Sequence, residues 1–446
     1  MTSMAAFQIF GLFLSIAILI FMIFKGVNPL IASITAALAA GLTNGLGIWE
    51  TLTDYYVNGF ITYFGQLLIM FILSTIYGQV MGESGSAHKI AYTFIDLLGK
   101  KSTILVIGLT TGILVYGGVS AMVVVFTVLP FAIVLIEEAN IPKVLLPAII
   151  TWGQATFAMG SLPGSPQLAN VLPPLYFGTQ PTAGAVLGII SAVIIIVLGY
   201  AYLQFQVKVY AKKGIGYDPD STINLQTGAP VSRQDCPGIV KAFLPILILI
   251  VLYITLANGT FGVVFSSTDA VNTAIFAAIV SVFLLHPGKF KKLKEAAVKG
   301  SMAWPVPLIN FASIVAFGSV IQAIPGFSAI TGLTAAISGN SYVSAAVSVN
   351  LLCGITGSAS GGLTIALNTL AETWLSTGAN PSVLHRICAI ASTGFDSMPH
   401  CGGVTTVSSL CNEPMKDCYK HIFVSTTLVP VIALVITLLL AAAGIC

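Results

Sequence analysis

Charged residues are scarce in this sequence. Only 7% of its 446 residues are Asp, Glu, Lys or Arg, whereas 56% are hydrophobic and the mean hydropathy is +0.97. Soluble domains carry about 25% charged residues, so this scarcity excludes a water-soluble globular protein. The composition predicts an all-α polytopic membrane protein.

Metal-binding and hydrolase motifs are also missing. The seven cysteines include no closely spaced pair of the zinc-binding type, so we expect free thiols and no metal or other cofactor. No GxSxG motif is present, which argues against a serine hydrolase, and we predict that the protein is not an enzyme. No basic segment with a cleavage site precedes the first apolar run, so we expect that run to be retained.

Crossing a bilayer takes about 20 apolar residues, and runs of this length recur along the chain. Two further apolar segments, about 104–137 and 344–376, are broken by Gly and Ser and predict re-entrant hairpins, although two full crossings each would also fit their length. The segments that precede them, 84–101 and 326–340, predict interfacial arm helices. The runs themselves predict ten transmembrane helices, at about 6–25, 28–48, 58–82, 143–175, 181–206, 238–258, 269–286, 300–324, 382–411 and 421–445.

The positions of the basic residues predict the orientation. If the N-terminus is outside and the hairpins do not cross, all but one of the 18 Lys and Arg residues fall on one side of the membrane. Positively charged loops face the cytoplasm, so both termini are predicted to lie outside. Arg386 is the exception, near the outer end of the ninth span. With His385 it could attract anions there, or it could snorkel to the interface.

The two halves of the chain match each other at a constant offset of 240 residues. Gly78 and Ser120, for example, match Gly318 and Ser360. Each half holds five predicted spans, an odd number, so the second copy enters the membrane in the opposite orientation and forms an inverted repeat. The predicted units are a first repeat at 1–206, a cytoplasmic linker at 207–236 and a second repeat at 237–446.

Each half breaks its apolar segments twice. The hairpins have Gly/Ser-rich tips at Tyr116–Ser120 and Thr356–Ser360. The spans that follow, 143–175 and 382–411, contain the sequences Ser-Leu-Pro from Ser161 and Ser-Met-Pro from Ser397, and proline interrupts a helix. In lipid, broken backbone persists only where protein, water or a ligand satisfies its polar groups, and the N-termini of half-helices favour anions. The breaks therefore predict a polar pocket for an anionic ligand.

Three stretches carry a resemblance to a known family: Phe395–His400 with Gly402 and Gly403, Asp417–Lys420, and the hairpin Gly357–Thr364. They resemble the gluconate permease (GntP-type) family of the ion transporter superfamily, and length and span pattern agree over the whole chain. The resemblance implies proton-coupled import of a small hydroxycarboxylate, such as gluconate or 3-hydroxybutyrate, across a bacterial inner membrane. It also implies a homodimer with scaffold and transport subdomains and an elevator-like motion.

Two other transport functions are compatible with the residues. A Na⁺-coupled carboxylate transporter is one alternative, because hydroxyl and carbonyl oxygens at the breaks can also bind Na⁺. An anion channel is the other, but paired hairpins within an inverted repeat favour alternating access over a continuous pore.

The candidate site residues lie at or beside the breaks. Asp396 is predicted to carry the coupling proton, because an acidic side chain inside a membrane is costly and usually functional; the alternative is that it caps a half-helix. His400 is predicted to exchange a proton with Asp396, or else to be a hydrogen-bonded packing histidine. The predicted substrate-binding residues are Gly118, Ser120, Ser161, Gly164, Ser165, Gln167, Asn170, Ser358, Ser360, Thr364, Asn368, Ser397 and Thr405.

Overall fold

The protein is helical throughout the part of the chain that the structure describes. The structure is a computed structural model, and it describes residues 3–116, 121–165, 167–218, 233–257, 265–335 and 340–446. Most of these residues lie in helices, and none of them lies in a strand. The prediction of an all-α protein is confirmed.

Each predicted apolar run contains at least one helix, and the runs broken by Gly, Ser or Pro contain two or more. The N-terminal half forms α1 (Ser3–Phe24), α2 (Pro29–Thr43), a π-helical turn (Glu50–Val57), α3 (Asn58–Glu83), α4 (Ser86–Leu98), α5 (Thr103–Tyr116), α6 (Ala121–Glu138), α7 (Leu146–Ala155), α8 (Leu168–Val171), α9 (Pro173–Phe177) and α10 (Ala185–Lys212). The C-terminal half forms α11 (Ile239–Ala257), α12 (Ser267–Leu285), α13 (Phe290–Gly300), α14 (Pro305–Ala323), α15 (Pro325–Ala335), α16 (Ser341–Thr356), α17 (Ala359–Ser376), α18 (Pro381–Ala391), α19 (Gly402–Leu410), α20 (Met415–Ile422) and α21 (Val429–Ala442).

Fewer helices than predicted are long enough to cross a membrane alone. Within the described residues, seven helices meet the length and composition of a span, or eight if Ser86–Leu98 and Lys100–Tyr116, which meet at 109°, form one. The sequence predicts ten crossings. Three predicted spans do not meet the test, because they are short or interrupted. α2 has 15 residues, the apolar helix counted in the 238–258 run is Ile239–Tyr253, and the second broken span divides into α18 with 11 residues and α19 with 9. The coarser prediction, a polytopic helical membrane protein, is confirmed.

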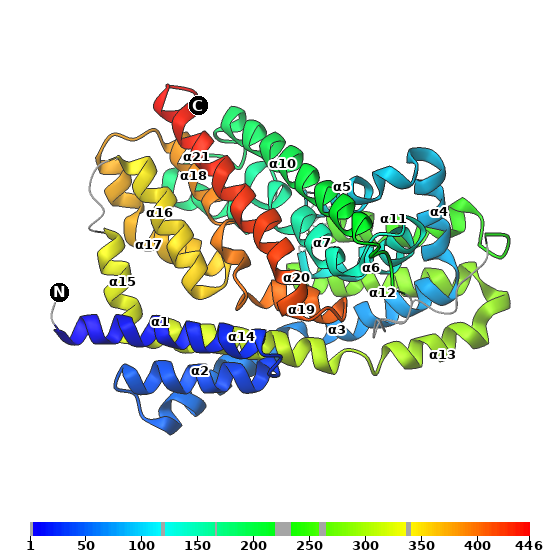
Figure 1. Ribbon diagram of the computed structural model, residues 1–446, viewed down its shortest axis with the longest axis horizontal. Helices are drawn as coiled ribbons and strands as arrows, with labels where there is room; N and C mark the ends of the chain where they lie inside the picture. Colours follow the sequence, from blue (N-terminus) through cyan, green and yellow to red (C-terminus); the bar gives the residue numbers. More distant parts are fainter. Residues whose placement is uncertain (1–2, 117–120, 166, 219–232, 258–264, 336–339) are drawn as a thin grey trace.

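The helices fall into two groups that differ in position (Figure 1). α1, α2, α3, α13 and α14 lie along one side of the molecule, and the helices of both hairpins and both broken spans lie on the other. The packing between the halves is reciprocal: α2 contacts α14 while α12 contacts α3, and α10 contacts α21. Within each half the ascending hairpin helix contacts the broken span that follows, α5 with α7 and α16 with α18.

Small side chains allow close helix packing in the first group. α2 buries Ala32, Ala36 and Ala40, and it contacts α1 and α14. Helices in lipid gain little from excluding water between them, so close backbone approach and dispersion contacts supply much of their association. The spacing of these alanines by four residues places them on one face of α2.

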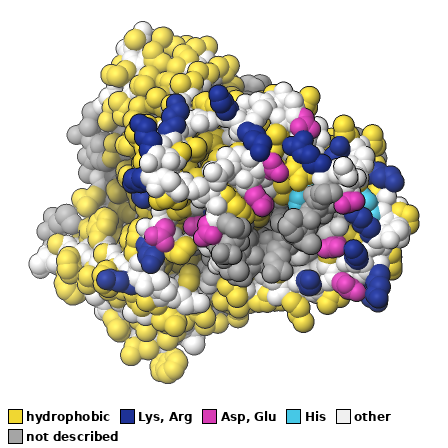
Figure 2. Space-filling model, turned by 45° about the vertical axis from the view of Figure 1, so that its right-hand side comes forward, with side chains coloured by type: hydrophobic (Ala, Val, Ile, Leu, Met, Phe, Trp, Pro, Cys, Tyr) yellow, Lys and Arg dark blue, Asp and Glu magenta, His cyan; other side chains and the backbone are white. Residues whose placement is uncertain are grey.

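Charged and hydrophobic side chains occupy different parts of the protein surface. Figure 2 shows Lys and Arg side chains spread over one face of the molecule, while the edges of the same view are mainly hydrophobic. α1, for instance, exposes Phe7, Phe10 and Phe21. This distribution fits a protein with an apolar belt in lipid and a basic face in water. Which face is cytoplasmic stays a prediction.

Candidate functional site

A cavity of about 440 Å³ lies where the second hairpin tip meets both broken spans. α3 and α14 also contribute to its wall. Among the described residues that line the cavity, Asp396 is the one carboxylate, and none is a lysine or an arginine. The polar side chains of the lining belong to Tyr63, Thr151, Gln154, Ser319, Gln322, Thr356, Ser358, Ser360, Asp396 and Ser397.

The second hairpin tip directs a helix N-terminus to this cavity. α16 ends at Thr356, and the chain reverses at Gly357, whose φ of 61° is a conformation that glycine adopts readily. Ser358 then caps α17, because its Oγ accepts a hydrogen bond from the Gly361 amide at 3.2 Å. First-turn amides have no acceptor within their own helix, and residues 358–361 all line the cavity.

A glycine holds the two arms of this hairpin together. A Cβ on Gly362 would lie 2.3 Å from the backbone nitrogen of Cys353, so no larger residue fits without moving α17 away from α16. The position of the α17 N-terminus therefore depends on this close approach.

The second broken span directs another helix N-terminus to the same cavity. After α18 the chain makes a 3₁₀ turn, Phe395–Ser397, which Asn350 anchors by accepting a hydrogen bond from the Phe395 amide at 3.2 Å. Asp396 is 6% exposed, and its Oδ1 accepts a hydrogen bond from Ser397 Oγ at 3.1 Å. α19 begins at Gly402, with no side-chain cap, and residues 401–404 line the cavity.

The two N-termini define the electrostatics of the cavity. The backbone dipoles place partial positive charge at the starts of α17 and α19, and unpaired first-turn amides can donate hydrogen bonds to an anion. A carboxylate can be held in this way without a cationic side chain. The cavity thus combines anion-binding backbone with hydroxyl and amide side chains around one acidic residue.

His400 lies behind the cavity rather than in its wall. Its Nε2 bonds to the carbonyl oxygen of Gly354 at 2.7 Å, and since a carbonyl only accepts, Nε2 carries the hydrogen. Nδ1 is buried with no hydrogen-bond partner among the described residues. The ring joins the second broken span to α16, as a packing histidine would, and its predicted proton exchange with Asp396 stays a prediction.

The predicted residues of the first broken span lie in its broken segment and outside the cavity lining. Ser161 Oγ lies 3.2 Å from Ser191 Oγ in α10. The Gln167 side chain donates to the carbonyl oxygen of Val115 at 2.8 Å, and Asn170 donates to Met159 and Leu162. Gly164 has a φ of 82°, and Ser165 is buried and accepts a long hydrogen bond from the Gln167 amide. The side chains of Ser165, Gln167 and Asn170 thus pair with backbone groups of irregular segments and helix ends, which need such partners when they are buried.

Arg386 supports the same broken segment from the other half of the chain. Its side chain is fully buried, in contrast to the exposed positions considered from sequence, where it would attract anions or snorkel. It donates to the carbonyl oxygens of Gly160, Ser161, Pro181 and Ala183 and to Asn170 Oδ1. The guanidinium therefore acts as a structural donor to irregular backbone, a task for which its fork of N–H groups is suited.

The remaining predicted residues lie either within helices or in segments that the structure does not describe. Thr364 bonds back to the Ser360 carbonyl, and Thr405 bonds back to Cys401 and Gly402 within α19. Asn368 accepts a hydrogen bond from Tyr176 at 2.6 Å, joining α17 to α9. Gly118 and Ser120 lie outside the described residues. Of the thirteen predicted substrate-binding residues, Ser358, Ser360 and Ser397 line the cavity, together with Asp396.

Several cavity residues were missed by sequence reasoning. Thr151 and Gln154 come from α7, and Gln322 comes from α14. Gln154 is 4% exposed, and its Oε1 has no hydrogen-bond partner among the described residues. A glutamine inside an apolar span indicates a functional site from the sequence, because burying an unpaired amide in a membrane protein costs free energy.

An ion pair joins the two broken spans at one end. Lys143, where the first broken span begins, lies 3.8 Å from the carboxylate of Glu413, which follows α19. Burial raises the pKa of Glu413, and Lys143 acts in the opposite direction. The pair links the two spans away from the cavity.

Apolar helices around a polar cavity built from broken helices define a membrane transport protein. The model of the GntP family permeases matches residues 7–443, so this chain belongs to that family and is a permease, not an enzyme. The uncharacterized transporter YxjC of Bacillus subtilis is 32% identical over an alignment of 447 positions, which covers 93% of this chain and 94% of that protein.

Two relatives named for gluconate match shorter segments. The high-affinity gluconate transporter of Escherichia coli is 30% identical over 149 residues, 32% of each chain. The gluconate permease of Zymomonas mobilis is 29% identical over 164 residues, 35% of each chain. The present chain thus aligns with about a third of the length of each.

Proposed function

We propose that this protein imports a small organic hydroxycarboxylate, such as gluconate or 3-hydroxybutyrate, by proton symport. The observation that supports this most strongly is the convergence of the α17 and α19 N-termini on one cavity that no lysine or arginine among the described residues lines. Backbone amides at these termini would bind the carboxylate. The relatives named as gluconate transporters favour a hydroxylated acid, and the Ser, Thr and Gln side chains of the lining offer partners for its hydroxyl groups.

The coupling proton is assigned to Asp396 by electrostatics. An anionic substrate in this cavity would lie close to the Asp396 carboxylate. Among the described residues, no cationic side chain forms an ion pair with Asp396. Two like charges in a site of low polarity repel strongly. Protonation of Asp396 removes that repulsion, so substrate and proton favour each other's binding, which is the thermodynamic basis of symport.

The reciprocal helix packing supports an inverted repeat with elevator-like alternating access. In the proposed repeat, α2 corresponds to α12 and α3 corresponds to α14. The α2–α14 contact therefore has its counterpart in the α12–α3 contact, as a pseudo-two-fold axis would require. In this proposal the helices from α1 to α3 and from α11 to α14 form the scaffold of a homodimer. The hairpins and broken spans form the transport subdomain, and α4 and α15 are the arms that connect it.

The location follows from the same family relationship. We propose that the permease lies in the inner membrane of a bacterium, with both termini outside. Its partners are then a small carboxylate, the coupling proton and the surrounding lipid.

Two alternatives differ in coupling. Sodium symport would use carbonyl and hydroxyl oxygens at the breaks, such as those of Thr356 and Ser358, in place of protonation at Asp396. An anion channel would use the same cavity as a pore. Both predict transport without a response to a proton gradient.

Reconstitution into proteoliposomes separates these possibilities. Counterflow with a panel of hydroxy acids and unsubstituted acids identifies the substrate, and imposed proton or sodium gradients identify the coupling ion. We expect accumulation of a hydroxycarboxylate driven by an inward proton gradient alone. Uptake driven only by sodium selects the first alternative. Equilibration of acids with no accumulation under either gradient rules out symport.

A further inference from the structure

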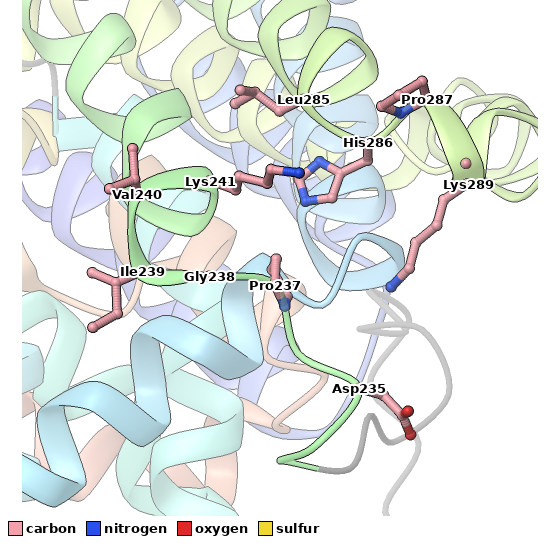
Figure 3. A pocket seen from close by; sticks show the side chains of 11 residues that line it. Asp235, Pro237, Gly238, Ile239, Val240, Lys241, Leu285, His286, Pro287 and Lys289 are labelled. Atoms are coloured by element: carbon pink, nitrogen blue, oxygen red, sulfur yellow. The ribbon is translucent and has the colours of Figure 1, made fainter.

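A second cavity, of about 680 Å³, lies where α11 begins and α12 ends (Figure 3). It shares no lining residue with the central cavity. Its basic lining residues are Lys241 from the first turn of α11, His286 at the end of α12 and Lys289 just beyond it. The proposed transport cycle uses none of these residues.

His286 leaves one buried ring nitrogen without a partner. The side chain is 8% exposed, and Nδ1 donates to the carbonyl oxygen of Val282 at 2.9 Å. Nε2 is buried and has no hydrogen-bond partner among the described residues. A buried polar atom normally has a hydrogen-bond partner, which here would be a ligand or an ordered water. It can accept from a ligand hydroxyl, or donate to an oxyanion once the ring is protonated.

Two ammonium groups accompany this nitrogen. Figure 3 shows Lys241 extending toward the His286 ring, while the carboxylate of Asp235 lies at the far edge of the pocket and points away from both. No described residue accepts a hydrogen bond from the Lys241 ammonium. Lys289 Nζ donates to the carbonyl oxygen of Ser84 at 3.0 Å, which holds its charge beside the pocket.

The α11 N-terminus adds a third source of positive potential. Residues 237–241, including the first turn of this 19-residue helix, line the pocket. First-turn amides and the helix dipole favour an anion at this end. Lysine ammonium groups, helix N-termini and imidazole N–H groups are donors with which proteins bind phosphate-type oxyanions.

The surface that continues from the pocket is apolar. α11 and α12 pack against each other. α11 exposes Val240, Leu247 and Val251, and α12 exposes Val280 and Leu284. The spacing of seven and four residues places each set on one helix face. A ligand with its anionic group in the pocket would therefore place an attached hydrocarbon chain along these faces. A phospholipid combines an anionic phosphate with hydrocarbon chains in this way.

We propose that this pocket binds the phosphate of an anionic phospholipid headgroup, with the acyl chains lying along the exposed faces of α11 and α12. The lysines supply charge recognition, and His286 recognises a headgroup hydroxyl or phosphate oxygen. A zwitterionic lipid would bring its own cation close to Lys241 and Lys289, so the site discriminates against it.

Native mass spectrometry of the full-length permease in detergent tests this proposal. Phosphatidylglycerol and phosphatidylcholine with identical acyl chains are titrated separately. We expect phosphatidylglycerol adducts to predominate, and K241Q/K289Q to weaken their formation on the order of tenfold. The single variant K241Q keeps the Lys289–Ser84 hydrogen bond and is expected to show a smaller loss in the same direction. K291Q/K292Q removes the same charge from exposed positions outside the pocket and is expected to leave adducts unchanged.

Three results would overturn the proposal. Equal binding of the two lipids would show that the phosphate site does not select anionic headgroups. Equal losses in K241Q/K289Q and K291Q/K292Q would show a diffuse charge effect. Displacement of phosphatidylglycerol by an equal concentration of inorganic phosphate would show that the site takes a soluble anion.

Discussion

Arg386 donates a 2.6 Å hydrogen bond to the Oδ1 atom of Asn170, across 216 residues of sequence. Asn170 in turn donates to the carbonyl oxygens of Met159 and Leu162, on the far side of the first break. An arginine of the second half thus holds the irregular backbone of the first half. The two broken spans form one structural unit through this contact.

Replacement of Arg386 by lysine should destabilise the permease by about 3 kcal/mol, because one ammonium cannot serve the carbonyl groups that the guanidinium now satisfies and would leave several of them unpaired. Thermal unfolding in detergent, followed by size-exclusion chromatography, measures the loss. The matched control is Arg233→Lys, since Arg233 is half-exposed and pairs with Asp96 at the surface. A control variant as unstable as R386K would contradict the assignment.

Replacement of Asp396 by asparagine should separate exchange from accumulation. The amide keeps the size of the side chain but carries no proton, so substrate counterflow should persist while accumulation driven by a proton gradient falls to background. Both are measured in proteoliposomes. Glu372→Gln, at an exposed position of α17, serves as the control and should accumulate substrate normally. Wild-type accumulation by D396N would remove Asp396 as the proton carrier.

Two substitutions of Ser358 distinguish capping from substrate contact. At an N-cap, alanine costs about 1 kcal/mol but glycine only a few tenths. If the hydroxyl also contacts substrate, both variants should raise KM by about tenfold, since each loses a hydrogen bond to a charged group. If the hydroxyl only caps α17, then S358A alone should be impaired. Uptake kinetics and thermal stability are recorded for both.

Replacement of Gly362 by alanine should disrupt the second hairpin. The added Cβ would meet the backbone nitrogen of Cys353 at 2.3 Å, so α17 has to move away from α16 and the cavity opens. We expect a sharp loss of folded protein and of uptake. Gly332→Ala is the matched control, because that helical glycine has no atom within 4 Å of an added Cβ. It should be as stable as the wild type or slightly more so, since alanine favours helix by about 1 kcal/mol.

Replacement of Gln154 by leucine should affect stability and transport in opposite directions. Removing a buried oxygen that has no partner among the described residues should stabilise the protein by about 1 kcal/mol. Loss of a polar group from the cavity should weaken substrate binding. Gln167→Leu provides the contrast, because Gln167 donates to Val115 at 2.8 Å and its loss should destabilise. Unchanged KM in Q154L would place Gln154 outside the binding site.

The sequence predicted the features that depend on residues close to one another in the chain. Apolar runs located the helices, and the glycines and prolines within them located the breaks, because both effects act within one turn of the chain. Ser358 and Asp396 were found in this way, each standing beside a break that lines the cavity. The family relationship was also legible from contiguous residues, notably Phe395–His400.

Only the tertiary structure decided which polar groups face the cavity and which satisfy backbone. Asn170 and Ser161 stand beside a break just as Ser358 does, yet they bond to Arg386 and α10 and not to the cavity. Gln154 lies in α7, one residue before that helix ends, and the fold places it in the lining although it was not predicted there. The reason is that a break shows only that backbone groups need partners. Whether a distant side chain or a ligand supplies them depends on contacts between segments more than 200 residues apart, such as Arg386 with Gly160.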